Sequence, residues 1–356
     1  MEAAIKYRSL GHTDIQLSEI GLGTMNFGAN VDERTASAQL DFAVAEGVNL
    51  VDTAETYPFP PTEQTHGASE SIIGRWLQKS KQRHNLYLVS KVAGPSTHLD
   101  YLRDGDLRFA RPNLRSWLDD SLSRLRTDYL DIGLLHWPER ATNVLGQLDY
   151  KPAKKETLAG AASDNIFAAL SAMGELVAAG KLRYIGLSNE TPWGVMRFLQ
   201  CAAQANLTKI TLIQNPYNLL NRSFDIGLAE VVHRENLGFL AYSPLAFGLL
   251  AAKHLSAGRA LPDTRLTSTA KLHRYLSEDS RAAANVYFDV ATRFNVELSQ
   301  MAIAYSLTRE YVTSVLVSAS NSEQLASNIN AVALNLDKSI LKAIDKIHRQ
   351  RPNPGL

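Results

Sequence analysis

Eight short apolar runs, each typical of a β-strand, alternate with amphipathic helix-like segments along the 356-residue chain. Most of these runs lack a polar–apolar alternation, as expected for parallel strands that are buried on both faces. Eight strands, each followed by a helix, make the element count of a (β/α)8 barrel, so we predict this α/β fold in a single domain. The expected strands are residues 19–22, 49–54, 86–92, 129–136, 184–188, 211–214, 238–243 and 314–318.

Additional segments interrupt or extend this regular alternation. Residues 6–10 and 15–17 predict a β-hairpin that precedes the barrel and plugs its bottom. Residues 138–163 form a long polar insertion after the fourth strand, at the end of the barrel where active sites lie, and loops of this length are usually functional. A final helix is expected over residues 338–348, before a tail rich in proline.

A doubly wound sheet with a nucleotide crevice is the alternative fold. The glycine cluster GLGTMNFG after the first strand favours it, but Asn26 stands where the pattern G-x-G-x-x-G requires glycine. At the helix starts, Asp164 and Ser320 are the side chains that we expect to act as N-caps.

The overall charge and the composition exclude several classes of protein. Lysine and arginine number 37 and aspartate and glutamate 36, so the net charge of +1 gives no sign of nucleic acid or an anionic membrane surface as a partner. Because the sequence has neither an apolar run of about 18 residues nor a secretory leader, we expect a cytoplasmic protein without membrane spans. His66 and His84 lack the spacing of metal ligands, and no G-x-S-x-G nucleophile motif occurs.

Four ionisable residues lie at or just past the ends of successive strands: Asp52, Tyr57, Lys91 and His136. A barrel of parallel strands brings such residues into one pocket. A lysine ammonium stabilises a phenolate and lowers the pKa of a tyrosine, an aspartate can hold the ammonium by an ion pair, and a histidine can orient a carbonyl oxygen. The four together predict proton donation to a carbonyl oxygen.

The sequence resembles the aldo-keto reductase family over essentially its whole length, in the motifs GLGTM, NLVDTAETY, LVSK, LDIGLLHWP, RYIGLSN, IQNPYN, AYSPLAFGLL and SASNSEQLASN. It is most similar to the Tas-like, NADP(H)-dependent subgroup. The resemblance implies transfer of a hydride from NADPH to an aldehyde or ketone without a metal. It implies that Tyr57 is the proton donor, that Lys91 and Asp52 tune it, and that His136 orients the carbonyl.

The resemblance also implies a set of cofactor contacts. Ser188, Asn189 and Gln214 match the residues that bind the carboxamide, and Tyr242 matches the aromatic residue that stacks on the nicotinamide. The remaining positions match the turn after the first strand, the loop over the pyrophosphate, the cations near the 2′-phosphate and the last helix of the barrel. They are Gly23, Thr24, Met25, Ser243, Pro244, Leu245, Gly248, Lys253, Arg265, Ser318, Ser320, Gln324 and Asn328.

Two positions depart from the family pattern: Ser318 replaces a frequent glycine and Ser327 replaces a glutamate that precedes Asn328. A cation near the ribose favours NADP over NAD. For a small-molecule carbonyl substrate we expect Trp137 and Phe247 to line the pocket, although Trp137 could equally fill the core. The physiological substrate stays open.

Other roles and states also remain compatible with the sequence. A cofactor-sensing protein like the channel β subunits of this family is the alternative function, and oxidation of an alcohol is the reverse reaction. Both monomers and rings are compatible with barrel helices, so the oligomeric state stays open too.

Overall fold

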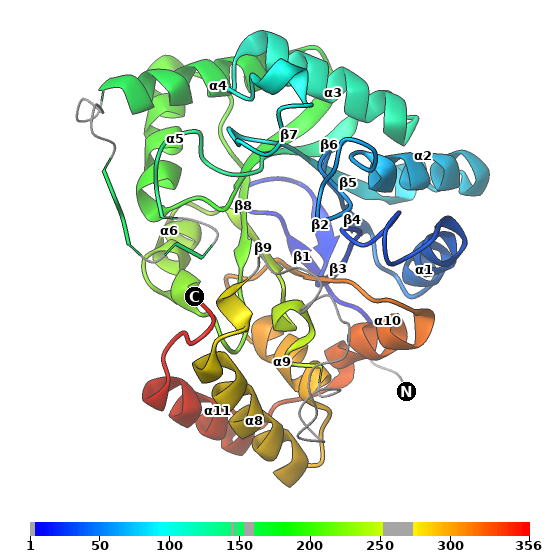
Figure 1. Ribbon diagram of the computed structural model, residues 1–356, viewed down its shortest axis with the longest axis vertical. Coiled ribbons are helices and arrows are strands. Elements are labelled where there is room, and N and C mark those ends of the chain that lie inside the picture. Colours follow the sequence, from blue (N-terminus) through cyan, green and yellow to red (C-terminus); the bar gives the residue numbers. More distant parts are fainter. Residues whose placement is uncertain (1–3, 144–145, 148, 153–159, 252–272) are drawn as a thin grey trace.

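Eight parallel strands close into a barrel in the computed structural model, in the order β10-β3-β4-β5-β6-β7-β8-β9. The structure describes residues 4–143, 146–147, 149–152, 160–251 and 273–356 (Figure 1). The predicted (β/α)8 barrel and all eight expected strands are confirmed, with small shifts at their ends. The strands are β3 (Ile20–Gly23), β4 (Leu50–Asp52), β5 (Tyr87–Val92), β6 (Leu130–Leu135), β7 (Leu182–Ser188), β8 (Leu212–Pro216), β9 (Gly238–Tyr242) and β10 (Ser314–Val317).

Helices surround the barrel and bury their apolar faces against it (Figure 1). Between β9 and β10 the described chain contains two of them, α8 and α9, and the expected C-terminal helix is α11. None of the described helices is long and apolar enough to cross a membrane. The helices are α1 (Glu33–Ala45), α2 (Ala68–Ser80), α3 (Arg111–Leu125), α4 (Gly160–Ala178), α5 (Pro192–Ala205), α6 (Leu228–Arg234), α8 (Glu278–Arg293), α9 (Leu298–Leu307), α10 (Ser322–Ile329) and α11 (Lys338–Gln350).

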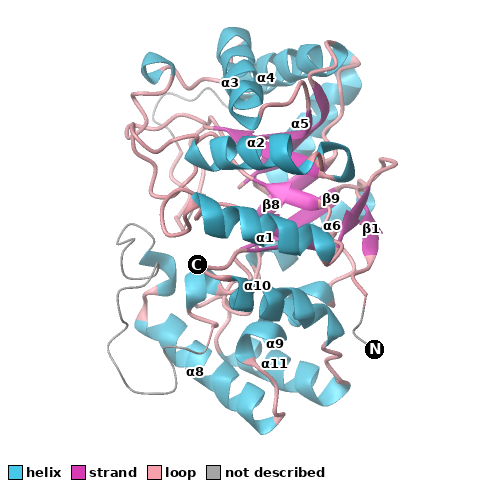
Figure 2. Cartoon of the chain, turned by 90° about the vertical axis from the view of Figure 1, so that its right-hand side faces the viewer, coloured by secondary structure: helices cyan, strands magenta, loops and turns pink. Residues whose placement is uncertain are grey.

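The predicted N-terminal hairpin is also confirmed, as β1 (Tyr7–Ser9) paired with β2 (Gln16–Ser18). The leucine and isoleucine side chains at its turn pack on inward-facing side chains of the barrel strands, so the hairpin plugs this end. At the turn, Gly11 has a φ of +53°, and a Cβ there would lie only 2.6 Å from the carbonyl oxygen of Asn236. Figure 2 shows β1 at one end of the barrel and long loops at the other.

Both predicted N-caps are wrong. Helix α4 already begins at Gly160, so Asp164 lies inside the helix and the last residues of the expected 138–163 loop are helical. Helix α10 begins two residues after Ser320, and the side chain of Asn321 accepts a hydrogen bond from the backbone N–H of Gln324. Asn321 takes the capping role because its backbone is extended and its side-chain oxygen reaches the first turn of the helix.

Candidate active site

A buried ion pair forms the centre of the site at the carboxyl ends of β4 and β5. The Nζ atom of Lys91 lies 2.7 Å from Oδ2 of Asp52 and 3.3 Å from the hydroxyl of Tyr57, and it also donates to the Thr53 carbonyl oxygen at 2.7 Å. The Lys91 side chain is fully buried. Burial lowers the pKa of Lys91, and the Asp52 carboxylate opposes that shift by stabilising the ammonium form.

His136 directly follows β6 and faces Tyr57, with ring centroids 5.9 Å apart and the rings nearly perpendicular. Burial, together with the positive charge of Lys91, lowers the pKa of His136 well below its usual range. The imidazole is therefore neutral at neutral pH, and a neutral ring keeps one N–H donor and one acceptor nitrogen. Its Nδ1 atom is buried and has no hydrogen-bond partner among the described residues.

The two halves of the barrel mouth are joined by hydrogen bonds. Nε2 of Gln214, at the end of β8, donates to Oδ1 of Asp52 at 2.7 Å. The side chain of Asn189 donates to the His136 carbonyl oxygen at 2.9 Å and accepts from the Tyr242 hydroxyl at 2.6 Å. The predicted proton-donor and cofactor residues are therefore joined in one hydrogen-bonded network, in which the backbone N–H of Asn189 also donates to the Gln214 carbonyl oxygen.

Asn189 has a left-handed backbone with a φ of +54°. Asparagine tolerates this conformation better than most residues. Strained backbone conformations of this kind are common at functional sites. Here the conformation turns the chain away from β7 at the point where the Asn189 side chain bonds both the Tyr242 hydroxyl and the His136 carbonyl oxygen.

A single large cleft contains most of the residues that the sequence singles out. Its volume is about 1970 Å³, whereas pockets for drug-sized ligands measure roughly 300–1,000 Å³, so the cleft is larger than a site for one such ligand. The predicted residues that line it are Gly23, Met25, Asp52, Tyr57, His136, Trp137, Ser188, Asn189, Gln214, Tyr242, Ser243, Pro244, Leu245, Phe247, Gly248, Ser318, Ser320, Gln324 and Asn328.

Other predicted residues lie behind the cleft or outside the described chain. Lys91 is buried beneath Asp52 and Tyr57 and acts on the cleft through them. Thr24 is fully buried, and its hydroxyl contacts the Asp52 carbonyl oxygen and the Ser69 hydroxyl, so this geometry gives no support to a contact between its side chain and a cofactor. The two predicted cations, Lys253 and Arg265, lie outside the described residues.

The far end of the cleft combines the end of β10 with helix α10. The side chain of Asn328 donates to the Ser318 carbonyl oxygen at 3.3 Å, and the Gln324 side chain accepts from the backbone N–H of Ser320. Ser327, where the family pattern has glutamate, donates to Oε2 of Glu297 at 3.0 Å. A carboxylate from the start of α9 therefore stands beside the substituted position and also lines the cleft.

One wall of the cleft escaped the sequence analysis: the loop of residues 95–108 after β5. Its anchor is a bidentate pair in which the Arg103 guanidinium donates to both carboxylate oxygens of Glu55, at 2.7 and 2.9 Å. Glu55 is buried and also accepts from the backbone N–H of Ala93. A separate apolar cluster supports the loop and includes Leu99, Leu102, Leu107, Tyr101 and Trp137.

The position of Glu55 between Asp52 and Tyr57 could have indicated that it has an ion-pair partner, because a buried carboxylate needs one. The Trp137 indole completes the attachment of the wall by donating from Nε1 to the Pro95 carbonyl oxygen at 3.0 Å. Trp137 lines the cleft and also packs against the small apolar cluster. The two roles that the sequence suggested for it, lining a pocket and filling the core, therefore both hold in part.

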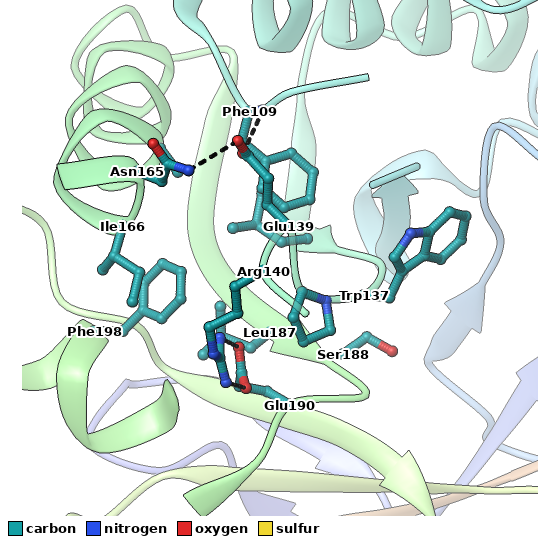
Figure 3. Close-up of a pocket in the computed structure, with 13 residues that line it drawn as sticks. Phe109, Trp137, Glu139, Arg140, Asn165, Ile166, Leu187, Ser188, Glu190 and Phe198 are labelled. Atoms are coloured by element: carbon teal, nitrogen blue, oxygen red, sulfur yellow. Dashed lines mark hydrogen bonds and ion pairs between the residues drawn. The ribbon is translucent and has the colours of Figure 1, made fainter. Parts of the chain in front are cut away.

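The start of the 138–163 insertion is fixed by charged contacts (Figure 3). The Arg140 guanidinium forms two hydrogen bonds to the carboxylate of Glu190, and the Glu139 carboxylate accepts from the backbone N–H of Phe109 and the side chain of Asn165. Because Glu190 follows Asn189 directly, this ion pair joins the insertion to the hydrogen-bonded network. Farther along, Gln147 also lines the cleft.

Comparisons with known proteins identify a family and several relatives with similar sequences. A model of the aldo/keto reductase family matches residues 19–349. The chain is 42% identical to "Protein tas" of Escherichia coli over 351 residues, which cover 99% of this chain and all of the relative. It is 33% identical to an "Aldo-keto reductase" of Babesia bovis over 75% of this chain and 97% of the relative, and 31% identical to the "Uncharacterized oxidoreductase YrpG" of Bacillus subtilis over 99% and 97%.

Proposed function

The chain belongs to the aldo/keto reductase family, and on that premise we propose that it reduces aldehydes or ketones with NADPH and that Tyr57 is the proton donor. The observation that carries this proposal is the Lys91 ammonium, which lies 3.3 Å from the Tyr57 hydroxyl and 2.7 Å from the Asp52 carboxylate. A fixed positive charge at that position favours the phenolate that remains after the proton has left.

NADPH supplies the hydride when it is bound. As negative charge develops on the carbonyl oxygen, Tyr57 transfers its proton to that oxygen. His136, held neutral by its surroundings, donates a hydrogen bond to the same oxygen and orients it. Asp52 fixes the Lys91 ammonium, and Gln214 in turn holds the second oxygen of the Asp52 carboxylate.

The donor set along the cleft is compatible with a dinucleotide. Ser188, Asn189 and Gln214 provide hydroxyl and amide groups that can pair with a carboxamide, and Tyr242 provides an aromatic face beside them. Preference for NADP over NAD remains a proposal from the sequence, through Lys253 and Arg265. The ratio of the kcat/KM values for NADPH and NADH measures this preference directly.

The first test is turnover with 4-nitrobenzaldehyde, followed by loss of NADPH absorbance. Tyr57→Phe should reduce kcat about 10²–10⁴-fold, the usual contribution of general acid catalysis, and should keep NADPH affinity. Tyr184→Phe is the matched control, because the Tyr184 hydroxyl bonds Asp14 at the hairpin end of the barrel and should not affect kcat. Retained activity in Tyr57→Phe would mean that another group is the acid.

Tight NADPH binding without turnover across a broad panel of carbonyl compounds would contradict the proposed reduction. It would favour the alternative function, a cofactor-binding regulatory protein. Co-purification of a partner protein would strengthen that interpretation. If the protein oxidises alcohols with NADP⁺ but does not reduce carbonyl compounds with NADPH, the same site would act in the oxidative direction.

A further inference from the structure

Arg274 is a cation that lines the cleft. It belongs neither to the four residues Asp52, Tyr57, Lys91 and His136 nor to the predicted cofactor residues. It lies in a short 3₁₀ turn, His273–Tyr275, before α8. Its guanidinium carbon lies 5.9 Å from the Phe247 ring centroid and 5.7 Å from that of Tyr275, and the Tyr242 side chain is close enough to raise the Arg274 pKa. Aromatic side chains therefore hold the guanidinium at the edge of the predicted nicotinamide site.

A count of the charges along the cleft sets Arg274 apart. Of the other charged groups in the described lining, Arg108 pairs with Asp106 at 2.7 Å, Asp52 pairs with Lys91, and the Glu297 carboxylate accepts a hydrogen bond from Ser327. Within the described part of the chain, Arg274 makes no ion pair with a carboxylate. A partly buried cation without a counter-charge is costly, and binding an anion from the cleft removes that cost.

The geometry of a guanidinium narrows the choice of anion. Arginine presents five N–H donors in a planar fork that matches two oxygens of a carboxylate or a phosphate. The 138–163 insertion approaches the same spot, since a Cβ at Gly146 would lie 3.7 Å from Cβ of Arg274.

We propose that Arg274 is an oxyanion-binding residue of the cleft and that it pairs with a carboxylate or phosphate group of a bound molecule. Two sources of that group are compatible with its position: the diphosphate of the dinucleotide, and an acidic group on the carbonyl substrate. This assignment rests on the proposed function for the identity of the ligands, but binding alone can test it.

The experiment compares Arg274→Gln and Arg274→Lys with the wild-type protein. The dissociation constant of NADPH is measured by fluorescence, and those of 4-carboxybenzaldehyde and 4-nitrobenzaldehyde are measured by calorimetry on the NADP⁺-loaded protein. Arg274→Gln should weaken an oxyanion ligand about tenfold or more, as expected for a hydrogen bond to a charged group. Arg274→Lys should lose less, because it keeps the charge but not the fork.

The pattern of losses identifies the source. Weaker NADPH binding assigns a phosphate group of the cofactor, whereas a loss confined to 4-carboxybenzaldehyde assigns a substrate carboxylate. Arg234→Gln, on helix α6 and paired with Glu230 on the surface, should leave all three constants within about twofold. Thermal unfolding of each variant checks that the fold is intact.

Two results would overturn the assignment. One is no change in any constant for Arg274→Gln, and the other is an equal loss for the neutral and the anionic aldehyde at unchanged NADPH affinity. Absence of catalytic turnover in the wild-type protein would refute the proposed reduction without affecting these binding measurements.

Discussion

The cluster at the strand ends and the loop wall of residues 95–108 border the same cleft but are built differently. In the cluster, Asp52 and Lys91 belong to strands, and Gln214, on β8 across the barrel from β4, satisfies the remaining carboxylate oxygen. The wall is held to the barrel mainly by the Glu55–Arg103 pair and a small apolar cluster. We infer that the cluster governs the chemical step, whereas the wall governs which carbonyl compound is bound.

This division predicts separable kinetic effects. A change within the cluster should act on kcat, because it alters groups that meet the reacting oxygen. A change in the wall should act mainly on KM and on stability, because it moves a surface that touches the rest of the substrate. The following variants test that separation, from the largest expected effect to the smallest.

Lys91→Met should have the largest effect. It removes the ammonium beside Tyr57 while filling much of the same volume, so kcat should fall about 10²–10⁴-fold with little change in NADPH affinity. Lys181→Met is the matched control, since Lys181 is exposed and pairs with Asp119 on the surface. A kcat close to that of the wild-type protein would place the proton chemistry outside the cluster.

Arg103→Met should release the wall. It leaves the buried Glu55 carboxylate without its ion-pair partner, and we expect the free energy of unfolding to fall by about 3–5 kcal/mol in chemical denaturation. The KM for 4-nitrobenzaldehyde should rise more than kcat falls. Arg108→Met, on the same loop but with an exposed partner, should leave the free energy of unfolding close to that of the wild-type protein.

A second substitution separates the charge effect from simple loss of packing. Adding Glu55→Gln to Arg103→Met removes the uncompensated carboxylate, so the double variant should be more stable than Arg103→Met alone. If the double variant is less stable, the cost of Arg103→Met does not come from the unpaired charge.

The pH dependence of stability reports on His136. Its pKa in the folded protein is well below 6.5, whereas in the unfolded chain it is near the ordinary 6.5. Below about pH 6.5 the unfolded state takes up a proton that the folded state does not, so the free energy of unfolding decreases as the pH falls. The slope from this one group reaches about 1.4 kcal/mol per pH unit.

His136→Gln should remove this contribution, and its stability curve should be flatter than that of the wild-type protein between pH 6.5 and the lowered pKa. His348, whose pKa is also lowered by burial, is present in both proteins and cancels in the difference. Parallel curves would mean that His136 takes up its proton normally in the folded state.

The barrel, and the grouping of Asp52, Tyr57, Lys91 and His136 at its mouth, could be predicted because both depend on local patterns. Apolar runs of strand length give the elements, and the ends of parallel strands must meet at one edge, so Asp52, Lys91 and His136 come together whatever the loops do. The resemblance to a family then supplied roles for residues such as Tyr242. The predicted N-caps failed because capping depends on one backbone angle that composition does not determine.

The wall and Arg274 could not be predicted, for a different reason. Glu55 and Arg103 are 48 residues apart, and their contact exists only because the loop after β5 folds back over β4. Arg274 follows a stretch without hydrophobic periodicity, so nothing local indicates which surface it faces. The Gln214–Asp52 hydrogen bond likewise joins two residues that are far apart in the sequence, because it crosses the barrel from β8 to β4.

Trp137→Phe should have the smallest effect, and it tests whether the cluster and the wall are coupled. Trp137 follows His136 directly, and its indole N–H bonds the Pro95 carbonyl oxygen of the wall. Phenylalanine keeps an aromatic ring but loses that hydrogen bond, so the free energy of unfolding should fall by about 0.5–1.5 kcal/mol. Loss of the same hydrogen bond should also raise the KM for 4-nitrobenzaldehyde.

Combining Trp137→Phe with Arg103→Met gives the sharper result. If the wall moves as one unit, releasing it through Arg103 already breaks the Trp137–Pro95 bond, and the effects on KM in the double variant should be smaller than additive. Full additivity would mean that the two attachments hold separate parts of the loop. The residues that affect the chemical step and those that affect substrate selectivity would then be divided within the wall, between Pro95 and Arg103.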